Sequence, residues 1–423
     1  MNKHRTGATF LASRLFYGAL FLPFLSVDLA SEEAKNFSQA FENGSAHISF
    51  RYRYENVEQD NSLKDANAST LKTRLNFSTQ TYNDVQAFVE VDDVSVIGAD
   101  SYNDTHFHET NHSVVADPEG TDVNQVWLRF SGLEKNVVTV GRQRINFDNQ
   151  RFIGGVGWRQ NEQTYDALTL TNTAFSNVKA RYVYMYNVNR IFGPGDGAQL
   201  ADFETDSHLL NVSFDGWSSA KVSVYGYLMD VEDAHAFATE TYGVRFNTHS
   251  KLSGGNKLLF TAELATQEDY GDYSDQTSFD ANYYTLSGGL KTKSLSLTLG
   301  YEVLEGNGSA SGESFRTPFA TLHKFNGWAD QFLGTPAAGL EDTYVNVSGN
   351  LGGFKLTAVY HDFSSEDGSD DYGSELDLAI SRSLHPKVSA LLKYADYSAD
   401  GEASSVLGKV DTQKIWFMLS MKF

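Results

Sequence analysis

Polar and apolar side chains alternate along most of the chain after its first 44 residues. In the first such stretch, Ile48, Phe50 and Tyr52 fall on one face of an extended segment, and Arg51 and Arg53 fall on the other. A period of two is typical of β-strands whose two faces meet different surroundings. We expect eighteen strands, at 45–57, 68–80, 84–94, 123–131, 136–146, 164–174, 177–189, 204–215, 219–230, 239–250, 255–268, 278–290, 293–305, 341–350, 354–364, 371–382, 386–398 and 411–423.

The connections between these predicted strands alternate between short and long. The short ones are turns rich in Gly, Asn, Asp and Ser. A soluble sandwich does not require this alternation, whereas a membrane barrel has two unlike rims. The sequence therefore predicts an all-β protein, an antiparallel up-and-down transmembrane β-barrel with short periplasmic turns and long extracellular loops. The long connections are expected at 95–122, 147–163, 190–203 and 306–340.

The last predicted strand carries one unbroken apolar face that includes Ile415, Phe417 and the terminal Phe423. This ending resembles the C-terminal signature of bacterial outer-membrane barrels, which implies recognition by the barrel assembly machinery. An open sheet in lipid would leave backbone groups unpaired at its edges, at a cost of several kcal/mol each. We therefore expect the first strand to pair with the last.

The N-terminus has the pattern of a secretory signal peptide, with a basic start followed by the apolar run 15–27. That run is too short to span a bilayer as a helix. We expect a signal peptide at 1–30, a short segment at 31–43 and the barrel at 44–423. The sequence determines the cleavage site only to within several residues. The alternative is a buried helix of the mature fold.

Composition narrows the classes of function. The chain of 423 residues has 54 acidic and 33 basic side chains and a formal charge of -21, which disfavours a nucleic acid partner. It has no cysteine, so disulfides, thiolate metal sites and thiol nucleophiles are excluded. No catalytic or cofactor-binding motif is convincing, and we expect neither an enzyme nor a cofactor.

Basic residues on the strands are expected to face the lumen, because Arg or Lys facing lipid at the bilayer midplane costs about 2–4 kcal/mol. The bases either grip the carboxylates of anionic solutes such as uronates, or pair with facing acids and only satisfy a polar interior. The inward candidates are Arg51, Arg53, Lys72, Arg74, Arg129, Arg142, Arg144, Lys179, Arg181 and Arg245, with acids at Glu90, Asp92, Glu263, Glu302, Glu375 and Asp377.

Two stretches, 141–168 and 320–344, resemble the alginate-export family of outer-membrane porins. The resemblance implies a monomeric barrel of eighteen strands with an arginine-rich passage for an anionic polysaccharide or smaller relatives. Trp158 and Trp328 would either stack on sugar rings or pack the loops against the wall. In the same light Arg142, Arg144, Arg151 and Arg159 would contact anions, with Asp148 and Asp166 as their partners or gate.

Two further patterns have weaker support. Residues 108–112 match H-E-x-x-H, but a zinc protease needs this motif on a helix, and the surroundings are rich in Asn, Asp, Thr and Ser. No metal site is therefore expected. Acidic loops near 267–275 and 364–371 could bind Ca²⁺ or bridge to lipopolysaccharide, although a solvated rim is the better explanation.

These observations predict a passive porin in the outer membrane of a Gram-negative bacterium, surrounded by lipid and lipopolysaccharide. Its solutes would be small and hydrophilic, with anions or sugar acids favoured. The alternatives are a dedicated export channel for an anionic, alginate-like polysaccharide and, less simply, an enzyme built on a barrel.

Overall fold

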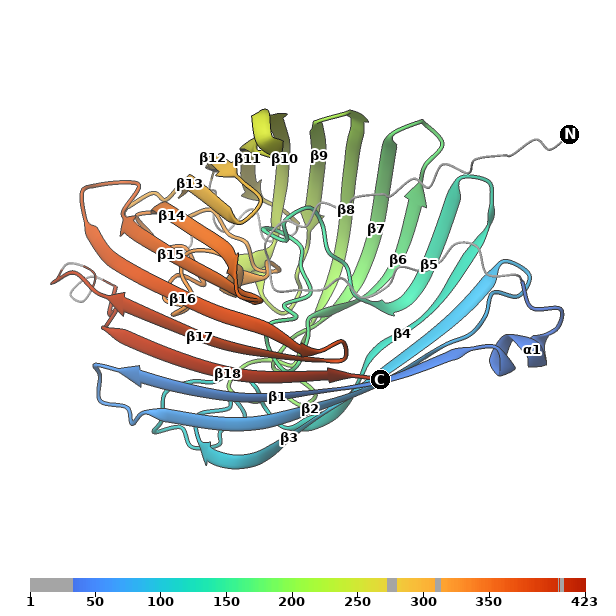
Figure 1. The fold of residues 1–423 in the computed structure, drawn as a ribbon, viewed down its shortest axis with the longest axis horizontal. Helices are drawn as coiled ribbons and strands as arrows, with labels where there is room; N and C mark the ends of the chain where they lie inside the picture. Colours follow the sequence, from blue (N-terminus) through green and yellow to red (C-terminus); the bar gives the residue numbers. More distant parts are fainter. Residues whose placement is uncertain (1–32, 272–279, 309–312, 402, 404–406) are drawn as a thin grey trace, which may run out of the picture. The chain divides into compact units, whose positions relative to one another are not determined.

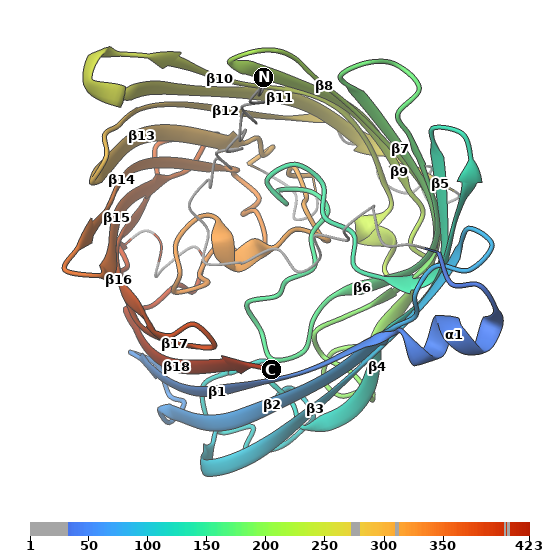
Figure 2. The ribbon, with the colours of Figure 1, turned by 45° about the vertical axis from the view of Figure 1, so that its right-hand side comes forward.

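The computed structural model describes residues 33–271, 280–308, 313–401, 403 and 407–423. Within these residues, eighteen antiparallel strands pair in sequence order, and β1 (Ser45–Gln59) pairs with both β2 (Ala66–Ser78) and β18 (Thr412–Lys422) (Figures 1 and 2). The sheet therefore closes into a barrel, as the alternating pattern predicted. Phe423 completes the closure, because its amide donates to the carbonyl of Ile48 at 2.8 Å.

The strand positions agree with the sequence pattern to within a few residues, except that β3 continues to Ser101. The other strands are β3 (Val85–Ser101), β4 (Gly120–Leu133), β5 (Asn136–Gln143), β6 (Thr164–Asn172), β7 (Val178–Asn189), β8 (Asp202–Trp217), β9 (Ala220–Met229), β10 (Thr239–Lys251), β11 (Lys257–Asp269), β12 (Asp280–Lys291), β13 (Leu295–Leu304), β14 (Leu340–Leu351), β15 (Phe354–Ser364), β16 (Asp371–His385) and β17 (Val388–Ser398).

A short helix, α1 (Phe37–Glu42), precedes the barrel and was not predicted. Asn36 caps it by accepting a hydrogen bond from the Gln39 amide at 2.9 Å. Phe41 stacks on Phe77 of β2, with ring centroids 6.2 Å apart, and α1 lies outside the ring of strands (Figure 2). The predicted signal peptide lies outside the described residues. Among the described residues, no helix is long and apolar enough to cross a membrane.

The outer face of the barrel is apolar and the inner face is polar. Along β4, Val126 and Leu128 point outward and are 48% and 52% exposed, whereas the alternating residues Gln125 and Trp127 are buried. Leu264 of β11 is 61% exposed in the same way. Such a continuous apolar exterior would be unfavourable in water and suits the hydrocarbon of a bilayer.

Long connections fill the interior at one end of the barrel, which we call the loop end; the opposite end, with the short turns, is the turn end. The connection at 144–163 and the described parts of the connection 305–339, at 305–308 and 313–339, lie inside the ring of strands (Figure 2). They pair with each other, since Gly154 donates to the Phe319 carbonyl at 2.9 Å and Thr321 donates to the Gln150 carbonyl at 3.0 Å. The fold therefore has its packed core within the barrel.

Candidate functional site

The wall formed by β2 and β3 carries a dense group of charges facing the lumen. Arg74 pairs in register with Asp92, and its Nε donates to the Asp92 carboxylate at 2.6 Å. Arg144 lies just beyond the end of β5 and contacts Glu90 through Nη2 at 3.1 Å. Side chains two residues apart share one face of a strand, which brings Lys72 and Arg74 together.

A carboxylate from the connection 144–163 completes this group. Glu162 accepts from Arg144 Nε at 2.8 Å and lies 3.1 Å from Arg74 Nη1 and 3.9 Å from Lys72 Nζ. Burial opposes ionisation, but the charges of Arg144, Arg74 and Lys72 hold the pKa of Glu162 well below its usual value. Glu162 was missed by sequence analysis, since it lies in an irregular loop where strand alternation gives no direction for a side chain.

Aromatic rings surround a second group of charges, near β17 and β18. Trp158 stacks on His323, with ring centroids 4.4 Å apart, and the Lys393 ammonium lies 4.2 Å from the Trp158 ring and 3.6 Å from the Trp328 ring. Trp158 also covers the Arg53 guanidinium at 4.2 Å. These contacts place both predicted tryptophans between loop and wall, which is the packing alternative.

Ion pairs tie the same two loops to the wall. Arg159 contacts Glu55 of β1 and Asp330 of the connection 305–339, each at 3.1 Å. Lys414 of β18 also contacts Asp330, at 2.9 Å. Burial counts against each charge, but these partners raise the pKa of Arg159, and the pKa of Asp330 is held well below its usual value by His323, Lys414 and Arg159. Arg53 in turn pairs with Asp117 at 3.0 Å.

The interior acids of β16 accept hydrogen bonds from loop backbone. Glu375 accepts from the Ala329 amide at 2.7 Å, and Asp377 accepts from the Trp328 amide at 3.2 Å. Gly327 is needed beside them because its φ is +84° and an added Cβ would lie 2.2 Å from a Glu375 oxygen. Close approach of the loop to the wall therefore depends on this glycine.

Other predicted bases also have acidic or aromatic neighbours. Arg151 Nε lies 3.1 Å from Glu302. Arg245 pairs with Glu263, which also accepts from the Tyr225 hydroxyl at 3.0 Å. The remaining contacts are those of Asp148 with Lys221 at 3.2 Å and Ser223 at 2.7 Å, of Arg181 with the Phe147 ring at 4.2 Å, and of Arg51 with the Gln160 side chain at 2.8 Å.

Arg142 departs from the predicted inward orientation. It pairs in register with Val126, whose side chain is exposed on the outer face, and shares its parity with Val140, which is 43% exposed. Its Nε donates to Asp166 at 2.9 Å, so both residues lie on the outer face near the loop end. The prediction assumed that every strand base faces the lumen, whereas strand parity puts Arg142 outward with Val140. Arg144 has the same parity but turns inward, because β5 ends at Gln143, between them.

The turn end of the lumen has a different electrostatic character. Lys251, Lys257 and Lys291 pair in direct register across β10, β11 and β12. When the five residues nearest the turn end are taken from each described strand, Asp215 is the one acid among them. The bases in the same segments that face inward by strand parity are Arg74, Arg129, Lys179, Arg181, Lys221, Lys251, Lys257, Lys291, Lys355 and Lys422. We call this set the basic belt.

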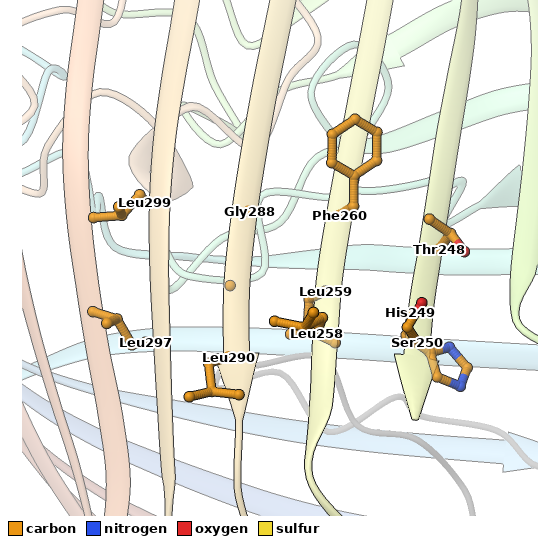
Figure 3. Close-up of a pocket in the computed structure, with 11 residues that line it drawn as sticks. Thr248, His249, Ser250, Leu258, Leu259, Phe260, Gly288, Leu290, Leu297 and Leu299 are labelled. Carbon is orange, nitrogen blue, oxygen red and sulfur yellow. The ribbon is translucent and has the colours of Figure 1, made fainter. Parts of the chain in front are cut away.

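Two other features lie apart from the lumen charges. Residues 108–112 form a loop of turns, where His108 bonds to Asp100 at 3.1 Å and His112 bonds to the Asp65 carbonyl at 2.6 Å. A hollow lined by Leu258, Phe260, Leu297 and Leu299 lies over Gly288, which has no side chain to fill it (Figure 3). These leucines and the phenylalanine are exposed outward, so the hollow belongs to the apolar exterior.

The closed barrel, apolar outside and charged inside, defines the class of channel-like β-barrels of the outer-membrane type. The family model described as alginate export matches residues 44–297, and the chain belongs to this family. The match includes the first resembling stretch, 141–168, whereas 320–344 lies beyond it. No curated protein shows significant similarity to the chain.

Solved structures with similar folds include three outer-membrane-type channels. Acinetobacter baumannii OccAB4 superposes with a TM-score of 0.67 at 15% identity, over 90% of this chain and 98% of that chain. Pseudomonas aeruginosa OccK3 (OpdO) has a TM-score of 0.68 at 11% identity, over 91% and 97%. Pseudomonas aeruginosa OpdK, solved with vanillate, has a TM-score of 0.67 at 12% identity, over 90% and 99%. At these identities the likeness concerns the fold.

Proposed function

We propose that the protein is a passive channel in the outer membrane of a Gram-negative bacterium, and that it passes small hydrophilic solutes carrying a carboxylate, such as sugar acids. The turn end then faces the periplasm and the loop end faces the outside. Surrounding lipid, lipopolysaccharide at the loop end and the barrel assembly machinery are the partners that this placement implies. The chain acts as a monomer without a cofactor.

The basic belt is the observation that carries this proposal. Like charges directly opposite each other in a sheet are destabilising, and Lys251, Lys257 and Lys291 form two such pairs in succession. Three adjacent inward lysines create a positive potential that attracts anions into the lumen. Arg74 and Lys221 of the belt pair with Asp92 and Asp148, as the arginines nearer the loop end pair with acids. Net selection of anions is therefore assigned to the adjacent lysines of β10, β11 and β12.

The loops favour small solutes over a polymer. The connections 144–163 and 305–339 contact each other inside the barrel through backbone hydrogen bonds and through the ion pair of Arg159 with Asp330. A polysaccharide chain would have to displace both. The crystal structure of OpdK with vanillate, an aromatic carboxylate, supports carboxylates as solutes of this fold.

Planar-bilayer recordings of the full chain test the proposal. We expect the reversal potential in a KCl gradient to report preference for Cl⁻, and glucuronate to alter the current where glucose does not. The variant with Lys251→Gln and Lys257→Gln should lose much of that preference, whereas Arg382→Gln, which removes a base from the outer face beside Phe354, should retain it. Cation preference in the unaltered protein would contradict the proposal.

Membership of the alginate export family favours one second candidate, an export channel for an anionic polysaccharide. Such a channel would need its interior loops to move aside. Current blockage by oligomers of guluronate and mannuronate added at the turn end, with no effect of the monomers, would favour this candidate over the first.

A further inference from the structure

One loop carboxylate occupies a group of bases that the barrel wall already holds in place. Glu162 reaches Arg74 and Arg144 at 3.1 and 2.8 Å, and Lys72 lies 3.9 Å away. Arg74 faces one carboxylate oxygen of Glu162 and Arg144 faces the other, in charge-assisted contacts that are stronger than neutral hydrogen bonds. Within the described residues, this is the point where three inward bases converge on one loop acid.

The wall bases around Glu162 outnumber the wall acids. Lys72, Arg74 and Arg144 contact Glu90 and Asp92, and the charge of Arg51 also acts on Glu162. Glu162 offsets part of this excess of positive charge. Buried charges need partners, so the group must hold Glu162 or another anion.

The backbone around Glu162 is anchored independently of the Glu162 side chain. Its neighbours anchor the backbone: Gln160 bonds to Thr70 at 2.9 Å, Asn161 bonds to the Pro118 carbonyl at 3.1 Å, and Gln163 bonds to the Gly154 carbonyl at 3.0 Å. To free the bases, Glu162 has to give up its ion pairs and the 3.3 Å hydrogen bond that it accepts from Asn124, while its backbone stays anchored. Arg144, the most exposed of the three at 17%, offers the first point of contact from the lumen.

We propose that Lys72, Arg74 and Arg144 form a binding site for one carboxylate of a passing solute, and that Glu162 is a displaceable mimic of that carboxylate. The inference rests on the proposed function and deepens it, because it assigns a binding site and a class of ligand, the monocarboxylates. The tethered carboxylate competes with the solute at a high effective concentration, so solutes bind weakly and pass on. This relationship explains how a channel can select carboxylates without retaining them.

Replacing Glu162 removes the competitor while leaving the site. In Glu162→Gln we expect the glucuronate concentration that halves the single-channel current to fall at least about tenfold, since a charge-assisted hydrogen bond contributes about 1.5–3 kcal/mol. Glucose should have no effect on either protein. The matched control is Glu366→Gln, a loop acid that accepts from the Gly306 amide at 3.3 Å and lies apart from the site; it should behave like the unaltered chain.

Titration calorimetry of glucuronate into the purified full chain measures the binding affinity of the site and does not depend on conductance. Tighter binding in Glu162→Gln supports the inference even if the anion preference of the pore is absent, in which case the proposed function alone fails. Equal affinity in the variant and the unaltered chain overturns the inference while leaving the proposed function standing. If Glu162→Gln does not refold, Glu162→Asp serves instead, because its shorter side chain reaches less far toward Arg74. It should give an intermediate gain in affinity for glucuronate, and no gain in affinity overturns the inference.

Discussion

His323 and Lys393 face each other at 2.6 Å, from the imidazole Nε2 to the ammonium Nζ. Nδ1 of the same ring lies 2.7 Å from Asp330, whose carboxylate can only accept, so the ring is neutral and Nε2 accepts from Lys393. Burial and the Lys393 charge keep the pKa of His323 well below its usual value, against the opposing effect of Asp330. The connection 305–339 is thus held to β17 by an imidazole that must stay unprotonated.

Acidification should loosen this loop. Because the unfolded or undocked histidine has a pKa near 6.5, it takes up the proton first, and the docked state loses about 1.4 kcal/mol for each pH unit below 6.5. We expect two signals to change between pH 7.5 and 5. One is the fluorescence of the tryptophan rings beside His323, and the other is the noise of the single-channel current. The variant His323→Asn should lack that transition, and an unchanged transition in the variant would contradict the assignment.

Gly327→Ala should destabilise the barrel by about 1–3 kcal/mol, because the backbone is left-handed there and the new Cβ would meet the carboxylate of Glu375. Urea unfolding of the detergent-refolded protein measures the change. Gly334→Ala is the control, since an added Cβ at this loop position has nothing within 4 Å. Equal effects of the two substitutions would show that the loop does not approach β16 as described.

Leu264→Arg tests which face of β11 meets lipid. The side chain is exposed outward near the middle of the strand, and an arginine there should cost about 2–4 kcal/mol in a bilayer. Thr285→Arg places the same side chain on the inner face, between Glu263 and Glu302 in register, where it should be tolerated. Folded yield in lipid vesicles, read by heat-modifiable gel mobility, distinguishes the two, and equal yields would contradict the orientation.

The local pattern of polar and apolar residues was enough to predict the strands, because successive side chains of a strand face its two environments in turn. Closure of β1 on β18 followed from the need of each strand edge for a partner. Parity also placed Arg53, Arg74, Arg245 and Glu263 on the inner face. The inward assignment of Arg142 was wrong, because Arg142 lies within β5 and shares the outer face with Val140; Arg144 turns inward because β5 ends at Gln143.

The sequence by itself determined the barrel, its apolar exterior and the strand bases that face its interior, since each of these depends on neighbours a few residues away. Only the tertiary structure decided that the loop at 144–163 and the described part of the loop at 305–339 fold inward, and that Glu162 meets Arg74 and Arg144. Irregular loops have no period from which a direction can be read, and their contacts join residues far apart in the chain, so three-dimensional packing alone specifies them.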